Sequence, residues 1–135
     1  QMKGRTKSLK GIISNSHIKQ CLKILKDGKI VMYGPDQDYR NKHSIISSFY
    51  GKRCLTTTVP AKLKKMSGCN VVYFDFFRVD DGFRAVIKDF NNESDSEKKF
   101  AENLNIEIEN SISKAPEQYL WHHRRFKSQY PEIYE

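Results

Sequence analysis

The segment from residue 70 to residue 89 places the strongest constraint on the fold. Residues 70–77 are the most apolar extended run of the chain, and residues 83–89 resume an extended pattern after Asp80, Asp81 and Gly82. Aspartate followed by glycine is typical of a tight β-turn, because both residues tolerate the backbone angles that such turns require. The segment therefore predicts an antiparallel β-hairpin.

Three other stretches have the apolar spacing and the flanking signals of helices. They start with capping side chains or proline, and two of them end at glycine, which terminates helices readily. In order, they are residues 17–27 between Ser16 and Gly28, the stretch from Thr58 and Pro60 to Gly68, and the stretch from a capping box of Ser94 and Glu97 to about Ala115, followed by a short helical turn at Pro116.

Two weaker extended runs complete the predicted order of elements. Residues 29–33 are apolar and lead into Gly34, which favours a buried strand that opens into a loop, and residues 44–50 form a second extended run. This order is typical of α/β proteins and predicts a mostly parallel sheet with an antiparallel hairpin at its edge, flanked by helices. Because parallel sheets are covered on both faces, we expect so few strands to be incomplete without an N-terminal half that precedes Gln1.

Composition restricts the partners and cofactors. Twenty-four Lys and Arg against 16 Asp and Glu give a formal net charge of +8, which favours anionic partners. The three cysteines show no C-x-x-C spacing, so the sequence predicts neither a disulfide framework nor a metal site, and we expect no cofactor. The longest apolar run, residues 71–77, is interrupted by Asp75 and is much shorter than the roughly 20 residues that cross a bilayer, so we expect no membrane span in this chain.

Two carboxylates follow the predicted strand at residues 29–33. Asp36 and Asp38 are expected at its carboxyl end, where open α/β sheets bind ligands. Such a pair can hold a cation or orient a base and a substrate hydroxyl group. Asp-x-Asp is also common in solvated turns, so the residues alone leave both interpretations open.

Residues 116–127 combine the only tryptophan with two histidines and three basic side chains. Arg124 and Arg125 can bind phosphate or carboxylate groups of a ligand, or one of them can pair with an acid when the segment docks on the domain. His122 and His123 are adjacent, which is unsuitable for holding one metal ion, so neither is predicted to be a ligand.

Both segments resemble the late acyltransferases of bacterial lipid A synthesis, a branch of the glycerolipid acyltransferase superfamily. The resemblance extends over roughly residues 3–127. Matching residues are Pro35, Asp36, Asp38 and Tyr39 in an acidic motif, Gly51 and Thr56, Thr57 and Thr58 after it, and Pro116, Glu117, Gln118, Tyr119, Leu120, Trp121, Arg124, Arg125, Phe126 and Lys127 near the C-terminus; Arg40 and Asn41 replace the family's usual Gly-Pro.

The resemblance implies a catalytic histidine followed five positions later by an acid, and the chain has no such pair. The residues five positions after His17, His43, His122 and His123 are Leu22, Ser48, Lys127 and Ser128. We therefore interpret residues 1–135 as the C-terminal part of a single acyltransferase domain with a glycerolipid-acyltransferase-like fold. The dyad is expected upstream, and the chain alone is expected to be inactive and prone to aggregate.

By the same resemblance, the whole enzyme is expected to move a fatty acyl chain from acyl carrier protein to a hydroxyl group of a phosphorylated lipid A precursor. Asp36 and Asp38 would support catalysis, and Arg5, Tyr39, Arg124 and Arg125 would bind the substrates. The expected location is the cytoplasmic face of the bacterial inner membrane, with an anchor outside this chain, and no nucleic acid is expected as a partner.

Two alternatives remain from the sequence. The net charge, the seven tyrosines and the mixture of aromatic and basic residues at 121–127 also suit a small nucleic-acid-binding module. The missing dyad also suits a non-catalytic relative that binds only acyl carrier protein or phospholipid.

Overall fold

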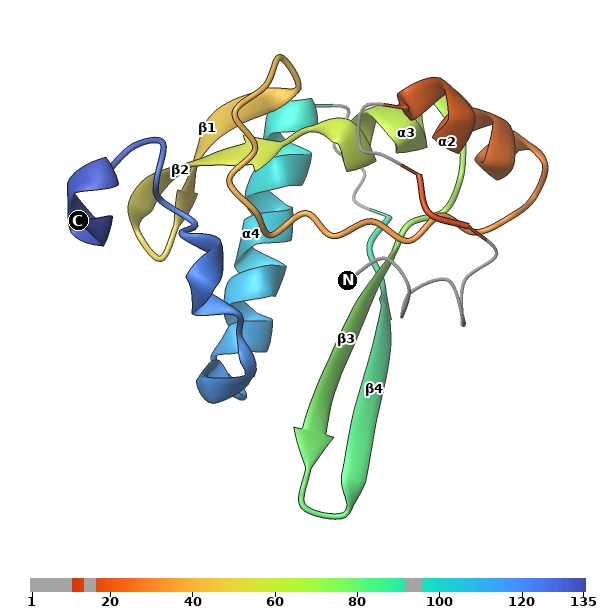
Figure 1. Cartoon of the computed structure of the whole chain (residues 1–135). Coiled ribbons are helices and arrows are strands. Elements are labelled where there is room, and N and C mark those ends of the chain that lie inside the picture. Colours follow the sequence, from red (N-terminus) through yellow and green to blue (C-terminus); the bar gives the residue numbers. More distant parts are fainter. Residues whose placement is uncertain (1–10, 14–16, 92–95) are drawn as a thin grey trace.

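The computed structural model describes residues 11–13, 17–91 and 96–135. Its elements are α2 (Ile18–Lys26), β1 (Ser44–Phe49), β2 (Lys52–Thr57), α3 (Val59–Ser67), β3 (Val72–Val79), β4 (Gly82–Asp89), α4 (Glu97–Ile112) and the short 3-10 helices η1 (Pro116–Gln118), η2 (Trp121–His123) and η3 (Pro131–Tyr134). Figure 1 shows α4 between two β-hairpins, with α2 and α3 packed together at one end.

Both strand pairs in the described residues are antiparallel, β1 with β2 and β3 with β4. The β3–β4 hairpin confirms the turn that Asp80 and Asp81 predict. In the other hairpin, Tyr50 and Gly51 form the turn with φ values of 48° and 72°, and positive φ at both central residues suits the twist of a two-residue hairpin.

The mostly parallel sheet that we expected is not found in the described residues. Each strand pairs with its neighbour in sequence across a two-residue turn, and only antiparallel strands can be joined so closely. The strand β2 was not predicted, because Lys52, Arg53 and the threonines that end it hide its extended character.

The prediction of a strand at residues 29–33 is also wrong, since this segment has no regular structure. Ile30 and Met32 are 93% and 74% exposed, whereas Val31 and Tyr33 pack against the cluster of Cys21 and its neighbours. An isolated extended segment forms no strand unless a neighbour accepts and donates its backbone hydrogen bonds, and no described strand pairs with it.

The three predicted helices are confirmed, with different ends. Ser96 caps α4 and accepts a hydrogen bond from the Lys99 amide, so α4 does not start with the expected capping box of Ser94 and Glu97. Ser94 lies outside the described residues, and so does Ser16, the expected cap of α2. Helix α4 ends at Ile112, and the helical turn expected at Pro116 is η1.

The main core lies where β1, β2 and α4 meet. Its buried residues are Phe49, Cys54, Ala61, Phe100, Leu104, Ile108 and Ile112. A second cluster of Cys21, Val59 and Leu63 joins α2 to α3. The helix α4 therefore packs directly on the β1–β2 hairpin.

The β3–β4 hairpin has one packed face and one bare face. On the packed face, the Asp75 carboxylate accepts hydrogen bonds from Ser111 and, at 3.0 Å, from Lys114. The opposite face, called here the aromatic face, consists of Val72, Phe74, Phe76, Phe83 and Ile87, which are 48% to 68% exposed. No helix in the described residues is long and apolar enough to cross a bilayer.

Candidate functional site

The acidic motif lies on the long connection between α2 and β1. Figure 1 shows this connection crossing in front of α4 before it turns toward β1. Residues 36–38, called here the acidic loop, are the part that contacts residues 116–128, called here the C-terminal segment. The structure thus brings together two motifs whose contacting residues are 83 to 90 positions apart in the sequence.

Asp38 and Asp36 have different surroundings. The Asp38 side chain is buried, and its two oxygens accept hydrogen bonds from the backbone N–H and the Oγ of Ser128, each at 2.8 Å. Asp36 is only half-buried, and within the described residues its carboxylate accepts no hydrogen bond and forms no ion pair. Of these two carboxylates, that of Asp36 is therefore the one available to a group from outside the described structure.

Two tyrosines surround the acidic loop. Tyr119 donates from its hydroxyl group to the Asp36 carbonyl at 3.4 Å, and Tyr39 donates to the Gly34 carbonyl at 3.3 Å. Burial raises the pKa of Tyr119 to about 12, and the negative charge of Asp36 adds to this rise. Burial likewise raises the pKa of Tyr39, with smaller contributions from Tyr33 and Asp36, so both hydroxyl groups remain donors at neutral pH.

Arg125 is a buried charge at 3% exposure. Its guanidinium group donates to four oxygen atoms and lies over one aromatic ring, and these partners come from the acidic loop, β1, β2 and α4. They are the Gln37 carbonyl at 3.1 Å, the Leu55 carbonyl, Thr56 Oγ1 at 2.9 Å, Asn105 Oδ1 at 3.2 Å and the Phe49 ring at 5.2 Å.

Arg125 forms no ion pair with any described residue, and its buried Nε is unpaired there. A buried charge is expensive unless polar groups replace water, and here neutral oxygen atoms take that role. Arg124 differs: it is exposed, has φ of 50° and lies over the Tyr134 ring at 5.8 Å. Arg5 lies outside the described residues.

Sequence reasoning missed Asn105 and Ser128. Asn105 is 1% exposed and donates from Nδ2 to the Ser48 carbonyl at 2.8 Å and to Thr56 Oγ1 at 2.9 Å. A signal was present, because Asn105 falls beside Leu104 on the apolar side of a predicted amphipathic helix. Ser128 gave no signal, since nothing local distinguishes it from a surface serine.

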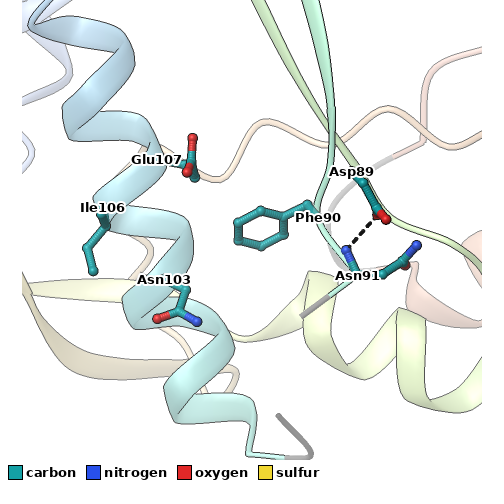
Figure 2. A pocket seen from close by; sticks show the side chains of 6 residues that line it. All are labelled: Asp89, Phe90, Asn91, Asn103, Ile106 and Glu107. Atoms are coloured by element: carbon teal, nitrogen blue, oxygen red, sulfur yellow. Dashed lines mark hydrogen bonds between the residues drawn. The ribbon is translucent and has the colours of Figure 1, made fainter. Parts of the chain in front are cut away.

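The site does not coincide with the groove between the end of β4 and α4. That groove has a volume of about 440 Å³. Figure 2 shows Phe90 pointing toward α4 between Asn103 and Glu107. None of the predicted site residues lines it. Among the described residues, no group of His, Cys, Asp and Glu side chains is arranged to hold a metal ion.

Comparison with known proteins agrees with the family resemblance of the sequence, and the match includes the acidic loop and the C-terminal segment. The family model described as bacterial lipid A biosynthesis acyltransferase matches residues 1–128. A lipid A biosynthesis palmitoleoyltransferase of Escherichia coli is 35% identical over 132 residues, covering 95% of this chain and 43% of the relative.

Two further relatives agree. A lipid A biosynthesis lauroyltransferase of Escherichia coli is 35% identical over 130 residues, covering 93% of this chain and 42% of the relative. A lipid A biosynthesis acyltransferase of Haemophilus influenzae is 30% identical over 135 residues, covering 95% of this chain and 43% of the relative. The chain thus spans less than half the length of these relatives, and it belongs to the bacterial lipid A biosynthesis acyltransferase family.

Proposed function

We propose that this chain forms part of an enzyme that transfers a fatty acyl chain to a lipid A precursor. The observation that supports this most is the match to the family over residues 1–128, which includes both the acidic loop and the C-terminal segment. Relatives of similar identity are named as palmitoleoyl and lauroyl transferases. A reading as a nucleic-acid-binding module has no comparable support.

The proposed reaction is attack of a hydroxyl group on a thioester. A histidine from the remainder of the enzyme removes the hydroxyl proton, the oxygen attacks the thioester carbonyl, and the carrier thiolate leaves and takes up the proton as the ester forms. Asp36 supports this step, because its carboxylate is free of hydrogen bonds within the described residues. In this role it orients the histidine or the acceptor hydroxyl group.

We further propose acyl carrier protein as the donor and a phosphorylated glycolipid as the acceptor. The net charge of +8 suits both, because each partner is anionic. Arg5, Tyr39 and the exposed Arg124 are proposed to bind anionic groups of these substrates. The proposed location is the cytoplasmic face of the inner membrane, and the mostly parallel sheet is proposed to form only together with an N-terminal half.

A chimeric enzyme tests the proposal. The 135 residues replace the matching segment of the Escherichia coli lauroyltransferase, and acyl transfer is measured with acyl carrier protein thioesters and with a glycolipid acceptor. We expect the chimera to be active and Asp36→Asn to lower kcat by about 100-fold, the lower end of the range for acid–base contributions. The chain alone should show no turnover.

The matched control is Asp27→Asn, an exposed acid whose contact is with Lys29. It should leave kcat within about twofold of the unaltered chimera, as surface substitutions away from a site usually do. An Asp36→Asn chimera with full activity would remove Asp36 from the chemistry. Turnover by the 135-residue chain alone would contradict the need for a dyad from outside it, and a chimera that binds acyl carrier protein without turnover would favour a non-catalytic relative.

A further inference from the structure

We propose that Tyr119, Arg125 and Ser128 form a clamp that positions the acidic loop, and that Asp38 is part of this clamp and does not take part in the chemistry. The inference rests on the proposed function, because it assigns roles within the loop that supports catalysis there. It separates two carboxylates that the sequence treats as equivalent.

Each residue of the acidic loop is held by a different residue of the C-terminal segment. Tyr119 donates to the Asp36 carbonyl at 3.4 Å and Arg125 donates to the Gln37 carbonyl at 3.1 Å. Ser128 donates to both oxygens of Asp38 at 2.8 Å. Three consecutive positions held in this way leave the loop little freedom to change its path.

The clamp is tied to the core through Arg125. The same guanidinium group that holds the Gln37 carbonyl also donates to Thr56 Oγ1 in β2 and to Asn105 Oδ1 in α4. A planar guanidinium presents several donors in a fixed arrangement, which a lysine ammonium cannot reproduce. The position of the loop is therefore set relative to β2 and α4, whose contact forms the main core.

The hydrogen bonds divide the work between the two acids. Both oxygens of Asp38 are occupied by Ser128, and the side chain is only 6% exposed, so it is unavailable to orient a base or a substrate. The Asp36 carboxylate has no such partner among the described residues. Fixing Asp38 thereby fixes the backbone from which the Asp36 side chain projects, two residues away.

Amide hydrogen exchange of the 135-residue chain tests the clamp and does not require enzyme activity. We expect Arg125→Lys and Ser128→Ala to accelerate exchange of residues 34–43 by about tenfold while α4 stays protected, because local opening exposes only the segment that loses contacts. Arg53→Lys and Ser48→Ala are the matched controls, since both side chains are exposed, and neither should alter exchange in the loop. Ser128→Thr keeps the hydroxyl group and should restore protection.

Two results would overturn the clamp. The first is unchanged exchange of residues 34–43 in both Arg125→Lys and Ser128→Ala. The second is equal acceleration in the loop and in α4, which would mean that these residues support global stability and do not position the loop.

Activity of the chimeric enzyme gives the second readout. Arg125→Lys and Ser128→Ala should lower kcat by about tenfold with KM within about twofold, as expected for displaced catalytic groups and intact substrate binding. Asp38→Asn should lower kcat less than Asp36→Asn, and Ser128→Thr should recover most of the loss. If kcat is unchanged in the clamp variants, or if Asp38→Asn is as harmful as Asp36→Asn, the assignment of Asp38 is wrong. An inactive unaltered chimera would instead reject the proposed function, and the exchange result would still decide whether the clamp exists.

Discussion

Asn105 and Arg125 share a hydrogen bond in the interior, in which Arg125 Nη2 donates to Asn105 Oδ1 at 3.2 Å. The amide of Asn105 faces the other way and donates to the Ser48 carbonyl at 2.8 Å. One side chain on α4 therefore supports both the β1–β2 hairpin and the C-terminal segment. Because Asn105 and Arg125 are both buried, either side chain that loses its partner has no water as a substitute.

Replacement of this amide should destabilise the chain strongly. We expect Asn105→Leu to lower the free energy of unfolding by about 2–4 kcal/mol, because the buried guanidinium group of Arg125 and the partly buried Ser48 carbonyl lose their partner. Urea denaturation followed by circular dichroism measures it. Asn110→Leu, at an exposed position of the same helix, is the matched control and should stay within about 0.5 kcal/mol. Equal effects of the two substitutions would contradict the network.

The aromatic face should drive self-association of the isolated chain. Phe76 stacks on Phe74 and Phe83 with ring centroids 6.1 and 5.2 Å apart, and the three residues are 48% to 67% exposed. Exposed apolar patches and unpaired strand edges both favour association.

Removal of two of these rings tests this. Phe76→Ser combined with Phe83→Ser should weaken association by about tenfold in sedimentation velocity, because the buried apolar area falls. Met66→Ser removes an equally exposed apolar side chain from α3, away from the aromatic face, and should change association little. A comparable effect of Met66→Ser would show that association is not specific to the aromatic face.

Gly68 ends α3 in the left-handed region, with φ of 69°. An added Cβ would meet no atom within 4 Å, so the cost of Gly68→Ala comes from the backbone alone. We expect a loss of about 1 kcal/mol in the free energy of unfolding. Gly34→Ala is the control, because its Cβ would only touch Asp36 Oδ1 at 3.8 Å and its φ is not positive. If Gly34→Ala costs as much as Gly68→Ala, backbone strain is not the cause.

Tyr119 should make the stability of the chain sensitive to alkaline pH. Burial, followed by the charge of Asp36, raises its pKa from 10.0 to about 12 in the folded state. The folded state therefore retains a proton that the unfolded chain loses, so this contribution is complete below pH 10 and is lost as pH rises toward about 12. Urea denaturation at pH 8, 10 and 11 should show the stability difference between the wild type and Tyr119→Phe shrinking as pH rises. A difference that stays constant with pH would contradict the raised pKa.

Local patterns determined the elements whose signals are local. The helices at Ile18–Lys26, Val59–Ser67 and Glu97–Ile112 follow from apolar spacing, and the β3–β4 hairpin follows from Asp80 and Asp81 before Gly82. These signals act within a few residues, because helix hydrogen bonds and tight turns connect near neighbours in the sequence. The acidic loop and the C-terminal segment were also recognisable, through their resemblance to the family.

Strand pairing was decided by the tertiary structure. Residues 29–33 have the composition of a strand but find no partner in the described residues, whereas the polar segment Lys52–Thr57 becomes a strand because β1 lies beside it. A strand exists only with a neighbour to pair with its backbone groups, so composition alone could not distinguish these two segments.

The different roles of Asp36 and Asp38 likewise depend on contacts between distant parts of the chain. By itself the sequence determined the family, the helices and the β3–β4 hairpin, and it marked both acids and both arginines as candidates. Only the tertiary structure placed Ser128 on Asp38 and Asn105 beside Arg125, at separations of 90 and 20 residues. The physical reason is burial: whether a polar side chain is free or occupied depends on which segments surround it once water is excluded.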